Sequence, residues 1–246
     1  QGYAGAMSIT GTDKENPVKS GIPIADLGAG LYAVIGILSA IQSREKNDFG
    51  EHVDISMLDT QVSLLTYMAT MHFLSGENPE PIGNQHMNHV PFNSYKTSDG
   101  FIQIGVVAED FWPSLIEALD LRQLDTEENK VRSGRLKNRE NIDQAVQEVF
   151  ITNTTEHWLK TLQEHRVPCG PINTLSETFQ DADLLKRNMI VEVLQDSGAA
   201  VKMPGNPTRL SRKQLVWGEE ASLANEIHLH CIHVGQHGRA TSLSTG

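Results

Sequence analysis

Residues 21–30 constrain the fold most. In them an apolar segment that contains Pro23 leads into the start of a helix that is rich in small residues. Apolar residues then recur at helical spacing as far as Ile41, which predicts an amphipathic helix that ends near Arg44. Asp26 stands where this helix begins. A carboxylate at such a position is ordinarily an N-cap, but the helix dipole also favours its ionised form, which is the form a nucleophile needs.

Three small residues, Gly28, Ala29 and Gly30, follow Asp26 after Leu27. Glycine costs a helix about 1 kcal/mol relative to alanine, so two glycines within one turn indicate that another group approaches closely here. We therefore take Asp26 as the candidate catalytic residue, and Gly28 and Gly30 as candidate contacts of a substrate.

The composition is that of an ordinary soluble globular protein, with 246 residues, 39% hydrophobic and 21% charged. The net charge of −11, spread along the chain, argues against nucleic-acid or anionic-membrane partners. The apolar run 31–41 is shorter than the roughly 20 residues that cross a bilayer, so no membrane span is expected. Two distant cysteines imply no disulfide framework, and we expect a cytoplasmic protein.

The segment after the first helix predicts one strand, one helix and one long loop. Residues 52–57 alternate polar and apolar as a half-buried strand does, and apolar spacing over residues 58–73 predicts a second long helix. Residues 76–91 break all periodicity and form either a solvated linker or a functional loop. In this loop Gly83 could bring backbone N–H groups towards an anion, and Asn84, His86 and His89 lie beside it.

The remainder of the chain predicts further helices and strands. A short apolar run predicts a buried strand over residues 101–107, and amphipathic spacing predicts helices over 111–119 and 142–150. Capping boxes are predicted for two pairs, Asn153 with Glu156 and Thr174 with Glu177. Residues 189–203 read as a β-hairpin with its turn at 196–198.

Metal binding is not predicted. The tail is rich in potential ligands, but their spacing matches no zinc pattern: His228, His230, Cys231, His233 and His237. The sequence also lacks a Walker A loop, a GxSxG elbow and an HExxH motif.

Six short motifs nevertheless occur in the order in which one enzyme family carries them, between residue 1 and about residue 210. They are QGYAGAMSITG (1–11), IADLGAG (24–30), GEHVDISMLD (50–59), GNQH (83–86), YKTSDG (95–100) and VPCGPI (167–172). Each is weak alone, but their collinearity is specific. The chain thus resembles the class III CoA-transferases, a family that includes formyl-CoA and carnitine-CoA transferases and α-methylacyl-CoA racemases.

This resemblance implies an α/β fold, with a Rossmann-like large domain and a smaller α/β domain in an interlocked homodimer. Residues 1–75 would be the central part of the large domain and 76–95 the linker and glycine-containing loop. Residues 96–185 would form the small domain, and 186–246 would return to the large domain with an atypical tail. The family's N-terminal segment would precede Gln1 and is expected to be missing from this chain.

The resemblance also implies a chemistry in which Asp26 attacks an acyl-CoA thioester and CoA passes to a small carboxylic acid, plausibly a dicarboxylate. Gly28, Gly30, Gly83, Asn84 and His86 would contact the acyl-CoA, and the loop would shield the intermediate from water. Coenzyme A would be a substrate, and no permanently bound cofactor is expected.

Two alternatives stay open. A racemase of this family pairs its aspartate with a histidine, whose position falls on Gly2 here, so His86 or His89 would have to replace it. A catalytically silent fragment that retains only dimerisation or binding is the other alternative.

Overall fold

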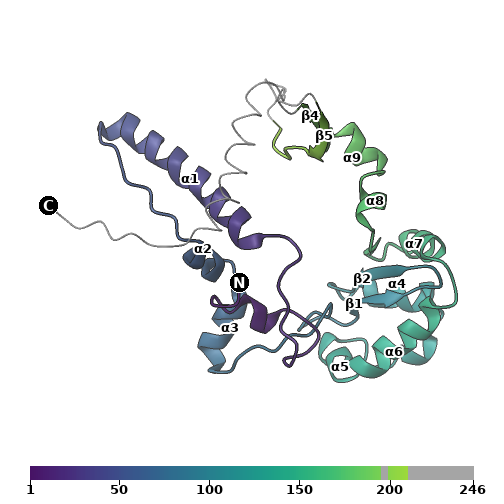
Figure 1. The fold of residues 1–246 in the computed structure, drawn as a ribbon. Coiled ribbons are helices and arrows are strands. Elements are labelled where there is room, and N and C mark those ends of the chain that lie inside the picture. Colours follow the sequence, from purple (N-terminus) through teal and green to yellow (C-terminus); the bar gives the residue numbers. More distant parts are fainter. Residues whose placement is uncertain (195–198, 210–246) are drawn as a thin grey trace. The chain divides into compact units, whose positions relative to one another are not determined.

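The computed structural model describes residues 1–194 and 199–209 of the chain, as Figure 1 shows. The chain separates into two compact units, Gln1–Ile172 and a second unit that begins at Asn173. The four-part division expected from the sequence stays a prediction.

The first unit begins with helices: η1 (Ala6–Ile9), α1 (Ile24–Asn47), α2 (Met57–Ser63) and α3 (Tyr67–Ser75). The predicted first helix is confirmed, and it runs three residues past Arg44 to Asn47. It ends at Asp48, which adopts a left-handed conformation (φ 59°) and donates its backbone N–H to the carbonyl oxygen of Arg44.

The second long helix was predicted wrongly, because the chain breaks between α2 and α3. Thr66 has φ 47° and ψ −124°, a backbone conformation that no α-helix contains, and it separates the two short helices. Apolar spacing continues through this break, so periodicity alone could not reveal it.

The predicted strand 52–57 is also wrong: residues 52–56 form no strand, and Met57 begins α2. The alternation instead reflects packing on α1, since a Cβ atom on Gly36 would lie 2.8 Å from Cγ1 of Val53. Ser56 caps α2 by accepting a hydrogen bond from the backbone N–H of Asp59.

The loop 76–91 contains neither helix nor strand, as predicted. It leads into a three-stranded antiparallel sheet of β1 (Phe92–Lys96), β2 (Phe101–Gly105) and β3 (Cys169–Pro171), with β2 in the middle. Tyr95 pairs with Ile102, and Gln103 pairs with Gly170. The buried strand predicted over 101–107 is confirmed as β2, whereas β1 was not predicted.

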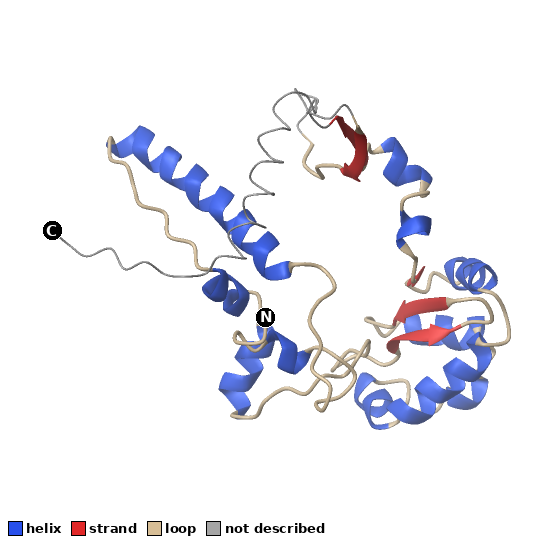
Figure 2. Cartoon of the chain, in the orientation of Figure 1, coloured by secondary structure: helices blue, strands red, loops and turns tan. Residues whose placement is uncertain are grey.

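Five helical elements follow β2 in the chain: α4 (Phe111–Ala118), η2 (Arg122–Leu124), α5 (Arg132–Lys137), α6 (Arg139–Phe150) and α7 (Thr155–Glu164). Both amphipathic helices expected here are confirmed, as α4 and α6. Figure 2 shows these helices beside the sheet. Their apolar faces and the inner face of β2 form one core, with Ile102, Trp112, Ile142 and Phe150 almost fully buried.

One of the two predicted capping boxes is confirmed and the other is wrong. α7 is capped by Thr154, whose side chain accepts from the backbone N–H of His157, and not by Asn153. The reciprocal capping box of Thr174 and Glu177 is confirmed at the start of α8 (Leu175–Thr178).

The second unit continues with α9 (Ala182–Lys186) and the antiparallel pair β4 (Ile190–Leu194) and β5 (Ala200–Pro204). The hairpin is thereby confirmed, and its turn at 196–198 lies outside the described residues. The mixed helix and sheet composition agrees with the expected α/β class. Both sheets of the described residues are antiparallel, so the Rossmann-like large domain stays a prediction.

Helix α1 is long and apolar but little buried. Only Ala25 and Gly28 are buried in it, while Leu31 is 67% and Leu38 61% exposed. By length and composition α1 could cross a membrane, contrary to the expectation drawn from the shorter run 31–41, because glycine and serine do not interrupt such a helix. A single helix of this kind is weak evidence, since a core helix of a soluble protein or a signal sequence meets the same criteria.

Candidate active site

Asp26 lies inside the first turn of α1 and is exposed. Pro23 occupies the N-cap position, so Asp26 is not the N-cap residue of α1. No hydrogen bond to Asp26 is formed by any residue that the structure describes, so its carboxylate is free at the positive end of α1. An ionised and accessible oxygen is what attack on a thioester carbonyl requires.

The two glycines behind Asp26 differ in their surroundings. A Cβ atom on Gly28 would lie 3.0 Å from both Cδ1 of Leu64 and Cγ2 of Thr60, so Gly28 allows α2 to approach α1. A Cβ atom on Gly30 would meet nothing within 4 Å. Close packing against α2 therefore explains why residue 28 is a glycine, whereas the space beside Gly30 is open on this chain.

Gly83 fixes the course of the candidate loop. It adopts φ +62°, a conformation that favours glycine, and its backbone N–H donates to the carbonyl oxygen of Gly11 at 2.7 Å. The Nδ2 atom of Asn84 donates to Oγ of Ser94 in the middle of β1. The N–H of Gly83 is thus engaged within the chain and does not point to an open anion site.

His86 is partly buried and contacts both its own loop and β1. Its N–H donates to the carbonyl oxygen of Phe92 at 3.2 Å, and its ring lies 4.6 Å from the His89 ring and 5.2 Å from the Phe92 ring, between centroids. Nδ1 accepts a hydrogen bond from the backbone N–H of Asn88, so the neutral ring carries its proton on Nε2. His86 can therefore donate a hydrogen bond through Nε2.

A row of polar side chains on α6, which we call the α6 polar stripe, holds this loop and β1. It consists of Arg139, Asp143 and Gln147, one helical turn apart. The Nη2 atom of Arg139 donates to the carbonyl oxygen of His86 at 2.7 Å, and Nε2 of Gln85 donates to Oδ2 of Asp143 at 3.3 Å.

The stripe continues along β1. Asp143 accepts from the hydroxyl of Tyr95 at 2.5 Å, and Gln147 exchanges two hydrogen bonds with the backbone of Lys96. Sequence analysis missed these residues, although their spacing of four on α6, beside the apolar face of Ile142 and Val146, was a usable signal.

His89 lies in a positively charged neighbourhood. Burial lowers the pKa of His89 and the charges of His86, Arg132 and Arg135 lower it further, while the carboxylate of Glu109 raises it by less. The buried Nη1 atom of Arg139 has no hydrogen-bond partner among the described residues.

The predicted site residues fall into two groups. Asp26, Gly28 and Gly30 share the start of α1, while Gly83, Asn84 and His86 share the loop. No hydrogen bond or ring contact joins Asp26 to Asn84 or His86 within the described residues. Among the described residues no group of three or more His, Cys, Asp or Glu side chains could hold a metal ion, and the histidine-rich tail lies outside these residues.

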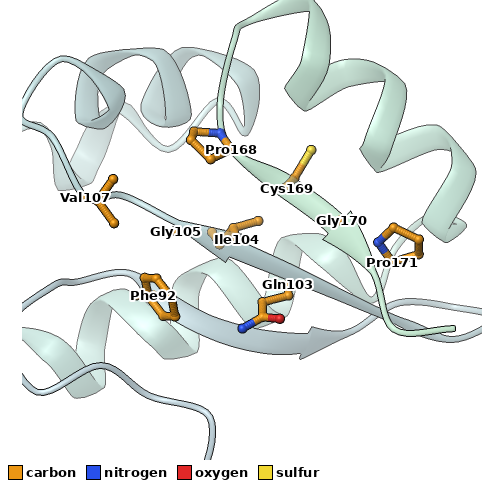
Figure 3. Close-up of a pocket in the computed structure, with 9 residues that line it drawn as sticks. All are labelled: Phe92, Gln103, Ile104, Gly105, Val107, Pro168, Cys169, Gly170 and Pro171. Atoms are coloured by element: carbon orange, nitrogen blue, oxygen red, sulfur yellow. The ribbon is translucent and has the colours of Figure 1, made fainter. Parts of the chain in front are cut away.

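A hollow of about 280 Å³ lies on the sheet, as Figure 3 shows. Its lining is mostly apolar, with Phe92 at one side, Gln103 in the middle strand and Cys169 in β3. Burial raises the pKa of the Cys169 thiol, which opposes a role as nucleophile.

Most of the sequence matches the model of one protein family. Residues 1–221 match CoA-transferase family III, and the chain therefore belongs to this family. The chain spans little more than half the length of the curated relatives it matches.

Curated relatives carry related names. A human succinyl-CoA:glutarate CoA-transferase is 29% identical over 232 residues, which cover 94% of this chain and 52% of that protein. A succinyl-CoA:mesaconate CoA-transferase of Haloarcula marismortui is 32% identical, covering 92% and 57%. An acetyl-CoA:oxalate CoA-transferase of Acetobacter aceti is 27% identical, covering 86% and 54%.

Solved structures agree with this assignment. A CAIB/BAIF family protein from Brucella suis superposes with a TM-score of 0.75 at 29% identity, covering 93% of this chain and 61% of that one. A Mycobacterium tuberculosis protein with 18% identity and a TM-score of 0.74 supports the fold alone.

Proposed function

We propose that the protein is a CoA-transferase that moves CoA between an acyl-CoA and a small carboxylic acid, with Asp26 as the nucleophile. The observation that carries the proposal is the exposed carboxylate of Asp26, free of hydrogen bonds from the described residues, at the positive end of α1. Membership of CoA-transferase family III supports the reaction type.

The reaction proceeds through covalent intermediates. An Oδ atom of Asp26 attacks the thioester carbonyl, the C–S bond breaks, and CoA leaves as a thiolate. The thiolate then attacks the aspartyl carbonyl of the mixed anhydride, which releases the donor carboxylate and leaves an aspartyl-CoA thioester. The acceptor carboxylate attacks this thioester and expels the thiolate, which finally attacks the acceptor's carbonyl and restores Asp26. Each step exchanges one activated acyl group for another, so the thioester's energy is retained.

The acceptor in this proposal is a dicarboxylic acid. The names of the relatives include glutarate, mesaconate and oxalate, all of which carry two carboxylates. Gly28 and Gly30 would border the acyl group, and the loop with Gly83, Asn84 and His86 would cover the intermediate. Because Gly28 also packs against α2, Gly30 is the stronger of the two candidates for this role.

The test uses the protein expressed from its complete gene, incubated with succinyl-CoA and hydroxylamine. An aspartyl anhydride or thioester at Asp26 converts to a hydroxamate, which peptide mass spectrometry locates. Asp26→Asn should form no hydroxamate and lose CoA transfer to glutarate by several orders of magnitude. Asp59→Asn is the matched control, because Asp59 also lies in the first turn of an exposed helix start. Full transfer activity in Asp26→Asn would rule out Asp26 as the nucleophile.

Two alternatives have separate readouts. A racemase would introduce solvent deuterium at the α-carbon of an acyl-CoA without any acceptor acid, and His86 is positioned to donate a proton through Nε2. A silent fragment would release no heat with CoA in calorimetry.

We further propose a cytoplasmic homodimer without a permanently bound cofactor and without membrane or nucleic-acid partners. The exposed apolar side chains along α1 support a protein contact, because large exposed apolar patches are unusual on monomers. Analytical ultracentrifugation measures the oligomeric state, and fractionation of cells measures the location.

A further inference from the structure

We propose that His86 makes the conformation of residues 87–89 sensitive to acid, because a nitrogen of its neutral ring accepts the hydrogen bond that holds this segment. The backbone N–H of Asn88 donates to Nδ1 of His86 at 3.0 Å. An imidazolium carries a proton on both ring nitrogens and can accept no hydrogen bond. Uptake of a proton at Nδ1 therefore breaks this bond, in the range of about pH 5 to 8 in which histidines commonly titrate.

The segment 87–89 depends on this one contact. It is the only hydrogen bond that residues 87–89 form with any residue that the structure describes. The chain on either side is held independently, since the N–H of His86 donates to Phe92 and its carbonyl oxygen accepts from Arg139. Val90, directly after the segment, is fully buried. Acid should therefore open residues 87–89 and leave the rest of the loop in place.

Two other histidines with a ring hydrogen bond respond differently to acid. Nδ1 of His72 lies 3.0 Å from the carbonyl oxygen of Glu77, and Nδ1 of His165 lies 2.8 Å from that of Thr161. A carbonyl oxygen can only accept, so both nitrogens carry a proton in the neutral ring and keep it in the imidazolium. Protonation leaves these two bonds intact, whereas it breaks the bond at His86.

The surroundings of the ring favour the opened segment once a proton is bound. The ring centroids of His86 and His89 lie only 4.6 Å apart. The charged groups around this pair are Arg132, Arg135 and Arg139, with Glu109 and Asp143 as the carboxylates. Both carboxylates are engaged elsewhere, Glu109 with Arg135 and Asp143 with the hydroxyl of Tyr95. A protonated pair thus lies among an excess of cations, and movement of His89 away from His86 relieves the repulsion.

The test measures pulsed amide hydrogen exchange at pH 7 and pH 5 in the protein expressed from its complete gene. Each rate is expressed as a protection factor, because the chemical exchange rate itself depends on pH. Protection of the Asn88 amide should fall about tenfold at pH 5, the size expected for the loss of one hydrogen bond. The amide of His86, which donates to Phe92, is the internal reference and should keep its protection. Unchanged protection of Asn88 overturns the proposal, and so does an equal loss at His86, because the whole loop would then open.

Substitutions of His86 separate its acceptor from other acid-sensitive groups. His86→Asn places a side-chain oxygen that does not titrate near the position of Nδ1, so Asn88 should stay protected at both pH values. His86→Ala removes the acceptor and should leave Asn88 unprotected at both. His72→Asn is the matched control, since acid does not break the His72 bond, and it should retain the tenfold fall at Asn88. A fall that persists in His86→Asn would show that another group responds to acid, and would exclude His86 as the sensor. None of these readouts depends on CoA transfer.

Discussion

The guanidinium of Arg135 donates from Nε to the carbonyl oxygen of Val90 at 2.9 Å, which ties the end of the loop 76–91 to α5. Arg135 is 1% exposed, lies over the Trp112 ring and pairs with Glu109 at 2.6 Å. A buried arginine is thereby satisfied by backbone carbonyls and one carboxylate.

Replacement of Arg135 by methionine should destabilise the protein by about 3 kcal/mol, because buried carbonyl groups lose their donor. Urea unfolding followed by tryptophan fluorescence measures the change. Arg122→Met is the control, since Arg122 forms an ion pair with Asp120 but is highly exposed, and it should change stability by less than about 1 kcal/mol. Equal effects of the two substitutions would contradict the buried network.

Alanine should stabilise the protein at Gly30 but not at Gly28. Gly30→Ala adds a methyl group in open space and removes a flexible residue from α1, so stability should rise by about 0.5–1 kcal/mol. Gly28→Ala forces Thr60 and Leu64 to move and should gain nothing or destabilise. Thermal unfolding measures both. Transfer activity lost in Gly30→Ala, despite greater stability, would support its place beside the acyl group.

His89 should make stability depend on pH. Its pKa in the folded protein lies below the ordinary value of 6.5, so the unfolded chain takes up a proton first as the pH falls. The contribution of His89 is therefore complete above pH 6.5 and is lost as the pH drops towards the folded pKa. His89→Gln should reduce the difference in stability between pH 7 and pH 5. An NMR titration midpoint of His89 at or above 6.5 would contradict this prediction.

Cys169 should react slowly with iodoacetamide at pH 8, because burial raises its pKa and little thiolate is present. Peptide mass spectrometry separates it from Cys231. In urea the rate should rise to that of an ordinary thiol. Equal rates with and without urea would contradict the inferred environment.

Local patterns predicted the elements whose own sequences carry a clear periodicity or a capping pair. The helix at Asp26, the strand 101–107 and the capping box at Thr174 followed from periodicity and side-chain chemistry, and the structure has all three. The motifs around Asp26 also identified the family, whose model covers residues 1–221.

Features that depend on distant contacts were missed. Strand β1 contains Asn93 and Ser94, which favour strands little, and pairing with β2 decides its conformation. The break at Thr66 lies in an uninterrupted apolar pattern. Arg139 touches a loop 53 residues away in sequence, so no local pattern linked it to His86.

The spacing of the α6 polar stripe restricts how the chain can vary in length. An α-helix turns by about 100° per residue, so one residue inserted between Arg139 and Asp143 would rotate one of them away from its partners. The hydrogen bond of Arg139 to the loop and that of Asp143 to β1 could then no longer form together, although both side chains are still present. Insertions and deletions should therefore accumulate in the segment 76–82 and be rare between residues 139 and 147.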